Sequence, residues 1–311
     1  MKYIVTGGAG FIGSNLVDKL LENGHKVVVV DNLENDESCQ RIESKEYSNW
    51  NLNNPTFIQQ DIATITDFSA FRNADGMFHL AALPQVQPSI NDPLKYNYVN
   101  VNGTLNMLVA CKEMGIKRFV FSSSSAVYGD VETVPTKEAS DLNPISPYGL
   151  HKLIGEYYCQ LFEKIYEMET FSLRYFNVFG PRQPLSGPYS LVMGKFANQL
   201  LHKLPLTING DGNQRRDFIY VGDVVDANIT CMTINHSKNN IINIGSGLNI
   251  SVNELANMFS KAAPRLNKPP VIEPHETLAN IEKAKKILNW KPKINLSEWI
   301  ETYKEELGIK A

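Results

Sequence analysis

Two features that mark membrane proteins and nucleic-acid-binding proteins are missing from this sequence. No segment approaches the ~20 consecutive apolar residues that a membrane-spanning helix requires. Lys and Arg form no dense cluster and the net charge is -3, whereas a protein that binds a phosphate backbone needs several cations on one face. We therefore expect neither a membrane span nor a nucleic-acid partner.

Cysteine is also scarce. The four cysteines, Cys39, Cys111, Cys159 and Cys231, form no C-x-x-C pair and have no nearby histidine at the spacing of metal ligands. We expect reduced, mostly buried thiols and no metal site. The N-terminal run MKYIVTGG leads directly into a strand-like segment without the pattern of a signal peptide, so we expect a cytoplasmic protein.

Apolar β-branched runs alternate with amphipathic runs in the first half of the 311 residues. The strand-like runs are YIVTGG, HKVVVV, TFIQQD, GMFHLAA and KRFVFSS, and the helical runs between them include NLVDKLLENG and NVNGTLNMLVACKEMG. The near-continuous apolar character of KVVVVD indicates a strand that is covered on both faces. The alternation predicts an α/β fold with a Rossmann-type, doubly wound parallel sheet.

A glycine-rich turn lies between the first predicted strand and the first predicted helix, in YIVTGGAGFIGSNLVDKLL. Gly8, Gly10 and Gly13 match G-x-G-x-x-G, and Gly7, Gly10 and Gly13 match the wider G-x-x-G-x-x-G spacing. Glycines there let a pyrophosphate approach the backbone N–H groups at the helix N-terminus. The alternative is a turn that only reverses the chain, but the strand and helix around it favour a dinucleotide site.

The next predicted strand ends in Asp31, followed by Asn32. A carboxylate at this place accepts hydrogen bonds from the adenine ribose and repels a 2'-phosphate, which favours NAD over NADP; taken alone, Asp31 could also cap a turn. Asp61 and Ile62 follow a further strand, where an adenine edge could lie, although Asp61 by itself is little more than a loop aspartate.

Tyr148 and Lys152 are four residues apart in SPYGLHK, so a helix brings them to one face. A nearby ammonium and a positive nicotinamide ring can lower the pKa of a tyrosine, ordinarily near ~10, into the range of a general base. The serine run that ends FVFSSSS can hold a substrate oxygen. The spacing alone is common on helix surfaces, but with the glycine turn it predicts oxidoreduction chemistry.

After about residue 180, glycine, proline and polar residues interrupt shorter periodic pieces. We predict an NAD-binding domain over 1–180 and a smaller C-terminal α/β lobe over 181–311 that mainly binds substrate. A later segment near 217–245 is expected to return to the first domain.

The chain resembles the extended short-chain dehydrogenase/reductases of the NAD-dependent epimerase/dehydratase family, and among them the UDP-hexose 4-epimerases. The motifs that carry the resemblance occur in family order: VTGGAGFIGS, VVDNL, FHLAA, NVNGTLN, SSSSAVYG, SPYGLHK, LRYFNVFGPRQ, GDGNQRRDFIYVGDV and AKKILNWKP. They cover nearly the whole chain and are more specific for the family than for the substrate.

The resemblance implies a catalytic triad of Ser124, Tyr148 and Lys152. The residues that it implies for the cofactor NAD are Gly7, Gly10, Phe11, Ile12, Gly13, Asp31, Asn32, Asp61, Ile62, Leu80, Ala81, Ala82, Asn100, Ser122, Tyr148, Lys152 and Tyr175. Those that it implies for a nucleotide-sugar substrate are Ser124, Asn177, Ser190, Leu191, Asn209, Arg216 and Thr277.

Dehydratases of this family carry an acidic residue just after the catalytic serine or threonine, where this chain has Ser125 and Ala126. Dehydration therefore lacks its acid and base. The resemblance implies instead that Tyr148 takes the proton of the sugar 4-hydroxyl while a hydride passes to tightly bound NAD, and that the 4-keto sugar turns over and is reduced on its other face.

The sequence departs from the family in one segment. The usual Arg-Pro-Gly-Asp-like stretch, whose arginine helps to clamp the diphosphate, is absent from PVIEPHETLANIEKAKKILNW. His275, Arg182 or Arg215 could supply part of that contact. Thr277 falls near a pocket position that is small in relatives admitting N-acetyl sugars, so we expect UDP-GlcNAc and UDP-GalNAc to be accepted beside UDP-Glc and UDP-Gal.

Two other functions stay open: an NAD(H)-dependent nucleotide-sugar 4-reductase or dehydrogenase with the same triad, and a dinucleotide sensor without catalysis. Helices around 95–114 and 148–168 resemble the pair with which family members form homodimers, so we expect a homodimer. Their apolar faces could equally pack on the chain's own sheet.

Overall fold

The computed structural model describes residues 1–34, 55–187, 190–235 and 240–309, and Cys39 lies outside them. Within these residues, seven strands form one sheet in the order β10-β6-β5-β4-β1-β2-β3, and every pairing is parallel. The strands are β1 (Lys2–Thr6), β2 (Lys26–Asp31), β3 (Thr56–Gln59), β4 (Gly76–His79), β5 (Arg118–Ser124), β6 (Glu169–Tyr175) and β10 (Ile241–Ile244). This order is that of a doubly wound sheet, and the predicted fold is confirmed.

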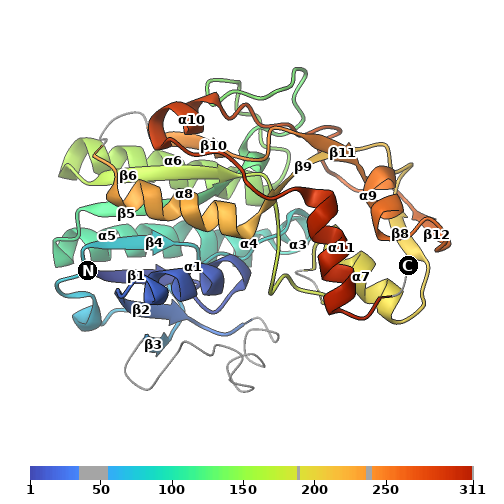
Figure 1. Cartoon of the computed structure of the whole chain (residues 1–311). Coiled ribbons are helices and arrows are strands. Elements are labelled where there is room, and N and C mark those ends of the chain that lie inside the picture. The colour runs from blue at the N-terminus through green and yellow to red at the C-terminus, as the bar shows by residue number, and fades with distance from the viewer. Residues whose placement is uncertain (35–54, 188–189, 236–239, 310–311) are drawn as a thin grey trace.

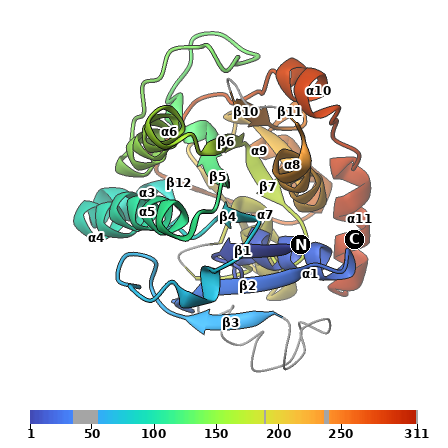
Figure 2. The same ribbon diagram turned by 90° about the vertical axis from the view of Figure 1, so that its left-hand side faces the viewer.

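Helices cover both faces of this sheet (Figure 2). One face carries α1 (Phe11–Glu22), α8 (Val221–Thr233) and α10 (Glu282–Leu288). The other carries α3 (Val86–Asn91), α4 (Pro93–Asn97), the π-helical turn η2 (Tyr98–Gly103), α5 (Thr104–Met114) and α6 (Pro147–Tyr166). Val27–Val30 of β2 are buried between the two layers, as the apolar run KVVVVD predicts.

A smaller lobe lies beyond the ends of the main strands (Figure 1). It contains a sheet of β7 (Asn177–Phe179), β9 (Arg215–Tyr220) and β11 (Asn249–Ser251), and a parallel pair of β8 (Leu206–Asn209) and β12 (Arg265–Lys268). Its helices are α7 (Val192–Leu201), α9 (Val252–Phe259) and α11 (Leu296–Glu306). A separate core, which includes Phe179, Phe196 and Phe259, holds them together.

The chain passes between the two lobes more than once. The segment that we expected to return to the first domain supplies α8 and β10, and β10 pairs with β6 at the edge of the main sheet. Ala284, Leu288 and Trp290, inside the range predicted for the substrate lobe, also pack into the core beside α1 and α8. The C-terminal part is thus shared between the lobes.

A buried ion pair fixes α6 against the sheet. Arg174 of β6 donates from Nε and Nη2 to the two Glu156 oxygens of α6, at 2.8 and 2.7 Å, and both side chains are almost fully buried. Ser123 at the end of β5 donates to the same carboxylate at 2.5 Å. Removing one partner would leave a buried charge uncompensated, so the ion pair is costly to break. Because Ser123 bonds the same carboxylate, the pair also ties the serine run at the end of β5 to α6.

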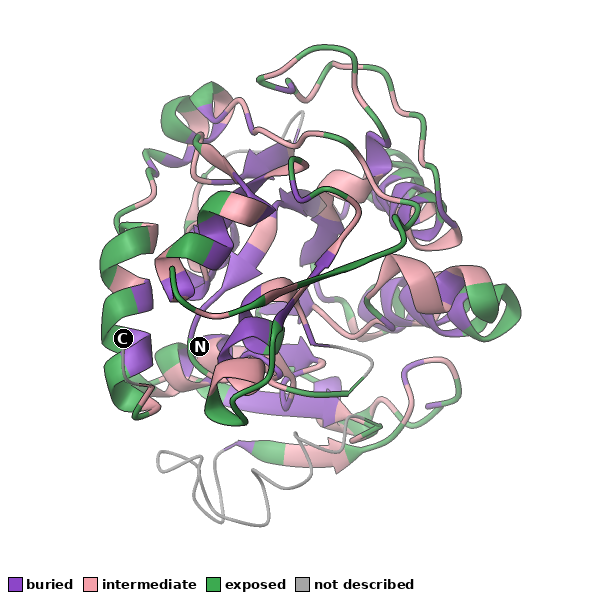
Figure 3. Cartoon of the chain, turned by 90° about the vertical axis from the view of Figure 1, so that its right-hand side faces the viewer, coloured by how far each residue is buried: buried purple, intermediate pink, exposed green. Residues whose placement is uncertain are grey.

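The three cysteines that the structure describes, Cys111, Cys159 and Cys231, are buried free thiols. Burial raises the pKa of each of them. The helices bury the side that faces the sheet and expose the other (Figure 3).

Among the described residues, no helix is long and apolar enough to cross a membrane. The His, Cys, Asp and Glu residues of this part of the chain form no group of three or more that could hold a metal ion.

Candidate active site

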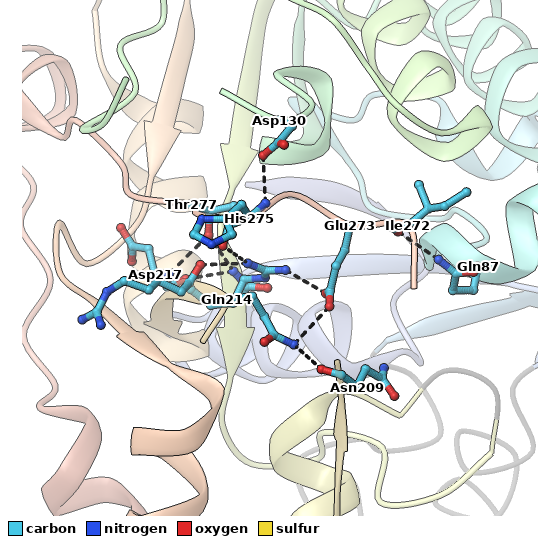
Figure 4. A network of polar contacts seen from close by, with 12 residues as sticks. Gln87, Asp130, Asn209, Gln214, Asp217, Ile272, Glu273, His275 and Thr277 are labelled. Carbon is cyan, nitrogen blue, oxygen red and sulfur yellow. Dashed lines mark hydrogen bonds and ion pairs between the residues drawn. The ribbon is translucent and has the colours of Figure 1, made fainter. Parts of the chain in front are cut away.

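A cavity of about 550 Å³ opens where the carboxyl ends of the main strands meet the smaller lobe. Ligands of doubly wound folds bind at this edge of the sheet. The ends of β1, β2, β4, β5 and β6 form one wall, and part of the segment 271–277 forms another. Figure 4 shows this second wall at close range.

The glycine turn brings the backbone to the mouth of α1. Gly7 has φ +68°, and a Cβ on Gly13 would lie 2.0 Å from the Gly7 carbonyl oxygen, so a side chain there would push the turn open. Among the described residues, no side chain caps the first turn of α1, whose N-cap is Gly10. Free N–H groups at a helix N-terminus with no Cβ in the way fit a pyrophosphate.

Asp31 ends β2 at the cavity wall. Its carboxylate accepts from the backbone N–H groups of Ala9 at 3.0 Å and Leu33 at 2.9 Å. Burial raises the pKa of Asp31, and these two bonds oppose the rise. Asn32 lies beside it and donates to Asp61 at 3.4 Å. An acidic rim at this place fits ribose hydroxyls and disfavours a further phosphate.

The three predicted catalytic residues converge at the end of β5. Ser146 caps α6 by accepting from the Gly149 N–H at 3.1 Å, and Pro147 occupies its first turn. This start directs Tyr148 and Lys152 into the cavity. Lys152 Nζ lies 5.9 Å from the centre of the Tyr148 ring and donates to the Ser122 carbonyl at 2.7 Å. The Ser124 hydroxyl lies close enough to the Tyr148 phenol to lower its pKa in part.

Burial dominates the electrostatics of this group. Burial raises the pKa of Tyr148, and the nearby Ser124 hydroxyl opposes part of this rise. Burial lowers the pKa of Lys152 to about 8, because the charged amine loses hydration. The chain alone therefore holds a neutral phenol, and a lowered Tyr148 pKa stays a prediction for the cofactor-loaded protein.

Most of the predicted site residues line the cavity. The cofactor set does so at Gly7, Gly10, Phe11, Ile12, Gly13, Asp31, Asn32, Asp61, Ile62, Leu80, Ala81, Ala82, Ser122, Tyr148, Lys152 and Tyr175. The substrate set does so at Ser124, Asn177, Leu191, Asn209, Arg216 and Thr277. The fold thus gathers residues from both lobes around one space.

Two predicted residues do not line the cavity. Asn100, in the π-helical turn, is buried and bonds both backbone groups of Leu83, at 2.8 and 3.0 Å, so it shapes the cofactor wall from behind. Ser190 is buried and donates to the Gly187 carbonyl at 3.1 Å. The sequence resemblance could not separate contact from support at these positions.

The cationic residues at the cavity differ from those that the sequence suggested as contacts for a diphosphate. Arg182 pairs with Asp18 at 2.5 Å, and Arg215 bonds Asn249 and Glu254. Neither of them, nor His275, lines the cavity. Lys195 of α7 lines it instead, and the sequence offered no signal beyond a lysine on an amphipathic helix.

Arg216 remains at the cavity wall and meets a carboxylate that sequence reasoning passed over. Its Nη2 lies 2.7 Å from Oε2 of Glu273, a residue of the segment that lacks the family's arginine. Glu273 also accepts from Gln214 Nε2 at 3.2 Å (Figure 4). This corner of the cavity is therefore nearly neutral.

Residues 3–245 match the model of the NAD dependent epimerase/dehydratase family. The chain belongs to this family. It is an NAD-dependent member, and the glycine turn, the uncapped start of α1 and Asp31 are the residues that fit NAD.

Named relatives of the family cover almost the whole chain. A UDP-glucose 4-epimerase of Mycolicibacterium smegmatis is 34% identical over 96% of this chain and 96% of its own length. The structure of the Bacillus cereus UDP-glucuronic acid 4-epimerase with UDP-glucuronic acid and NAD superposes with a TM-score of 0.89, at 34% identity over 99% of each chain. That of the Methanobrevibacter ruminantium UDP-N-acetylglucosamine 4-epimerase, in complex with UDP-N-acetylmuramic acid, has a TM-score of 0.86, at 34% identity over 98% of each chain.

The lowered pKa of Lys152 predicts a pH-dependent stability of this family member. Below about pH 8 the amine is protonated in both states, whereas between about pH 8 and 10.5 the unfolded chain binds a proton that the folded chain has lost. The free energy of unfolding therefore rises with pH in this window. From about pH 7.5 to 9.5, the cofactor-free wild type should gain about 2 kcal/mol more than Lys152→Met in urea titrations.

Lys19→Met is the matched control, since Lys19 is half exposed on α1. Its curve should stay parallel to that of the wild type. Parallel curves for Lys152→Met as well would contradict the lowered pKa.

Proposed function

We propose that the chain is a nucleotide-sugar 4-epimerase that inverts C4 of a UDP-hexose through a 4-keto intermediate. The observation that carries the proposal is the convergence of Ser124, Tyr148 and Lys152 at one end of a cavity whose other end holds the glycine turn. The relatives with three different UDP-sugars favour this substrate class. They leave the sugar itself to experiment.

The chain's own residues have distinct tasks in this reaction. Ser124 holds the sugar 4-oxygen beside the phenol, and Tyr148 takes and returns its proton. Lys152 is held beside the Tyr148 ring by its hydrogen bond to the Ser122 carbonyl. When it is charged, Lys152 favours the phenolate form of Tyr148. NAD supplies the hydride acceptor and donor at C4. Because inversion requires the hydride to return to the opposite face of C4, the 4-keto sugar would have to turn in the cavity between the two partial reactions.

The absence of a carboxylate at Ser125 and Ala126 supports epimerisation over dehydration, since both residues line the cavity beside Ser124. A 4-reductase would use the same triad but consume NADH in each turnover. A sensor without catalysis would need no proton acceptor poised beside a serine. Incubation with UDP-, GDP- and dTDP-sugars without added cofactor separates these functions, because only an epimerase inverts C4 over many turnovers.

Tyr148→Phe tests the proton acceptor. We expect C4 inversion to fall by about 10²- to 10⁴-fold, the contribution of general acid–base catalysis, while bound NAD stays unchanged. Coupled assays and the absorbance of bound dinucleotide measure the two quantities. Tyr166→Phe, at the exposed end of α6, is the control and should keep full activity. Inversion at the wild-type rate in Tyr148→Phe would refute the assignment.

Thr277 is proposed to admit N-acetyl sugars. Its hydroxyl oxygen lies 3.4 Å from Asn177 Nδ2 and 3.3 Å from the Asp217 N–H, at the cavity wall. We expect the wild type to act on UDP-GlcNAc and UDP-GalNAc, and Thr277→Tyr to lose at least about tenfold in kcat/KM for this pair alone, because its bulk fills the space.

Thr277→Val separates bulk from hydrogen bonding, since it removes the hydroxyl and keeps the size. It should retain the preference of the wild type. A wild type that turns over only the non-acetylated pair would exclude the idea.

We also propose that the protein is a homodimer through α4, η2 and α6. Leu150, Tyr157, Leu161 and Ile165 expose about half of their area along one side of α6, and Leu94 is 83% exposed on α4, which packs beside α6. Such a contiguous apolar face indicates an interface. Sedimentation should give twice the chain mass, and Leu161→Glu should give a monomer. A monomeric wild type at micromolar concentration would contradict the proposal.

A further inference from the structure

Glu273 places a carboxylate inside the cavity beside Arg216, an arginine available to a diphosphate. The two side chains form an ion pair at 2.7 Å, and both residues line the cavity. Arg216 is 9% exposed and Glu273 is 32% exposed. The guanidinium is thus already neutralised on the side of Nη2.

Arg216 does not need Glu273 to keep its position. Its Nη1 donates to the Arg215 carbonyl at 2.8 Å and to the His275 carbonyl at 3.3 Å. These bonds fix the plane of the guanidinium through the backbone. Glu273 therefore occupies a donor group that would otherwise face the cavity, instead of orienting it.

The cavity offers few other cations. Among the described residues that line it, the remaining cationic side chains are Lys152, which is committed to Ser122 at the catalytic end, and Lys195, which is exposed on α7. A diphosphate has at most two charges to meet there besides the catalytic lysine. An acidic side chain on one of them opposes the ligand at close range, because like charges a few ångströms apart repel strongly when partly buried.

The side chain of Glu273 can leave while its backbone stays. The segment around it is tied on one side by Gln87, which donates to the Ile272 carbonyl at 2.9 Å, and on the other by the His275 N–H, which donates to Asp130 at 2.8 Å (Figure 4). Gln214, the second partner of Glu273, keeps its bond to the Asn209 carbonyl at 2.9 Å. Displacement therefore breaks side-chain bonds only.

We propose that Glu273 is a displaceable counter-ion of Arg216, an internal anion that a nucleoside diphosphate has to replace on the guanidinium. The inference rests on the proposed function, since it takes the diphosphate of a UDP-sugar as the competing anion. Glu273 thereby weakens binding in proportion to the charge of the ligand. It sets affinity, whereas Arg216 supplies the contact.

Calorimetric titration of the full-length, NAD-loaded protein with uridine, UMP and UDP tests the inference. Glu273→Gln removes the charge and keeps the shape. We expect its Kd for UDP to fall about tenfold, or ~1.4 kcal/mol, its Kd for UMP to fall less, and its Kd for uridine to stay within about twofold.

Glu276→Gln is the matched control. It removes the same charge from the same segment, but Glu276 accepts from Asn249 at 2.6 Å and does not line the cavity. Its affinities should equal those of the wild type. An equal gain for uridine and UDP in Glu273→Gln, or no gain for UDP, would overturn the inference and leave the proposed function intact. A wild type that binds none of the three ligands would overturn the proposed function, and the inference with it.

Discussion

The site depends on one buried contact, the hydrogen bond from Lys152 Nζ to the Ser122 carbonyl. It joins the first turns of α6 to the last residues of β5 and so fixes the distance between the phenol and the serine run. The Arg174–Glu156 pair, which also holds Ser123, repeats this connection about one turn further along α6. The catalytic end is rigid because a charged side chain in an apolar interior has few other places to donate its protons.

The same burial tunes the chemistry. Loss of hydration keeps the Tyr148 phenol neutral and lowers the pKa of Lys152 to about 8, so that at neutral pH Lys152 is the charged member of the pair. A phenol that stays neutral in the chain alone avoids the cost of an isolated buried phenolate. We predict that the positive charge of bound NAD lowers the pKa of Tyr148 through the low dielectric of the cavity.

The sequence predicted what is local and missed what is assembled from distant segments. The glycine turn, the end of β2 at Asp31 and the Tyr148–Lys152 spacing each follow from a few adjacent residues, and all of them line the cavity. Arg182 and Arg215 looked available by charge alone, but Asp18 and Asn249, far away in the chain, engage them. The Arg216–Glu273 pair joins residues 57 positions apart, and neither periodicity nor a motif indicates such a pairing.

The two ends of the cavity follow different physical rules. Around Ser124, Tyr148 and Lys152, buried and half-buried groups are held by backbone and ion-pair contacts, a rigidity that suits proton transfer. Around Arg216, the partly exposed Glu273 side chain of a short segment forms the ion pair, while backbone carbonyls hold the guanidinium independently. For the proposed epimerase, this division would let adjustable charges hold the nucleotide while the reacting carbon meets a fixed acid–base pair.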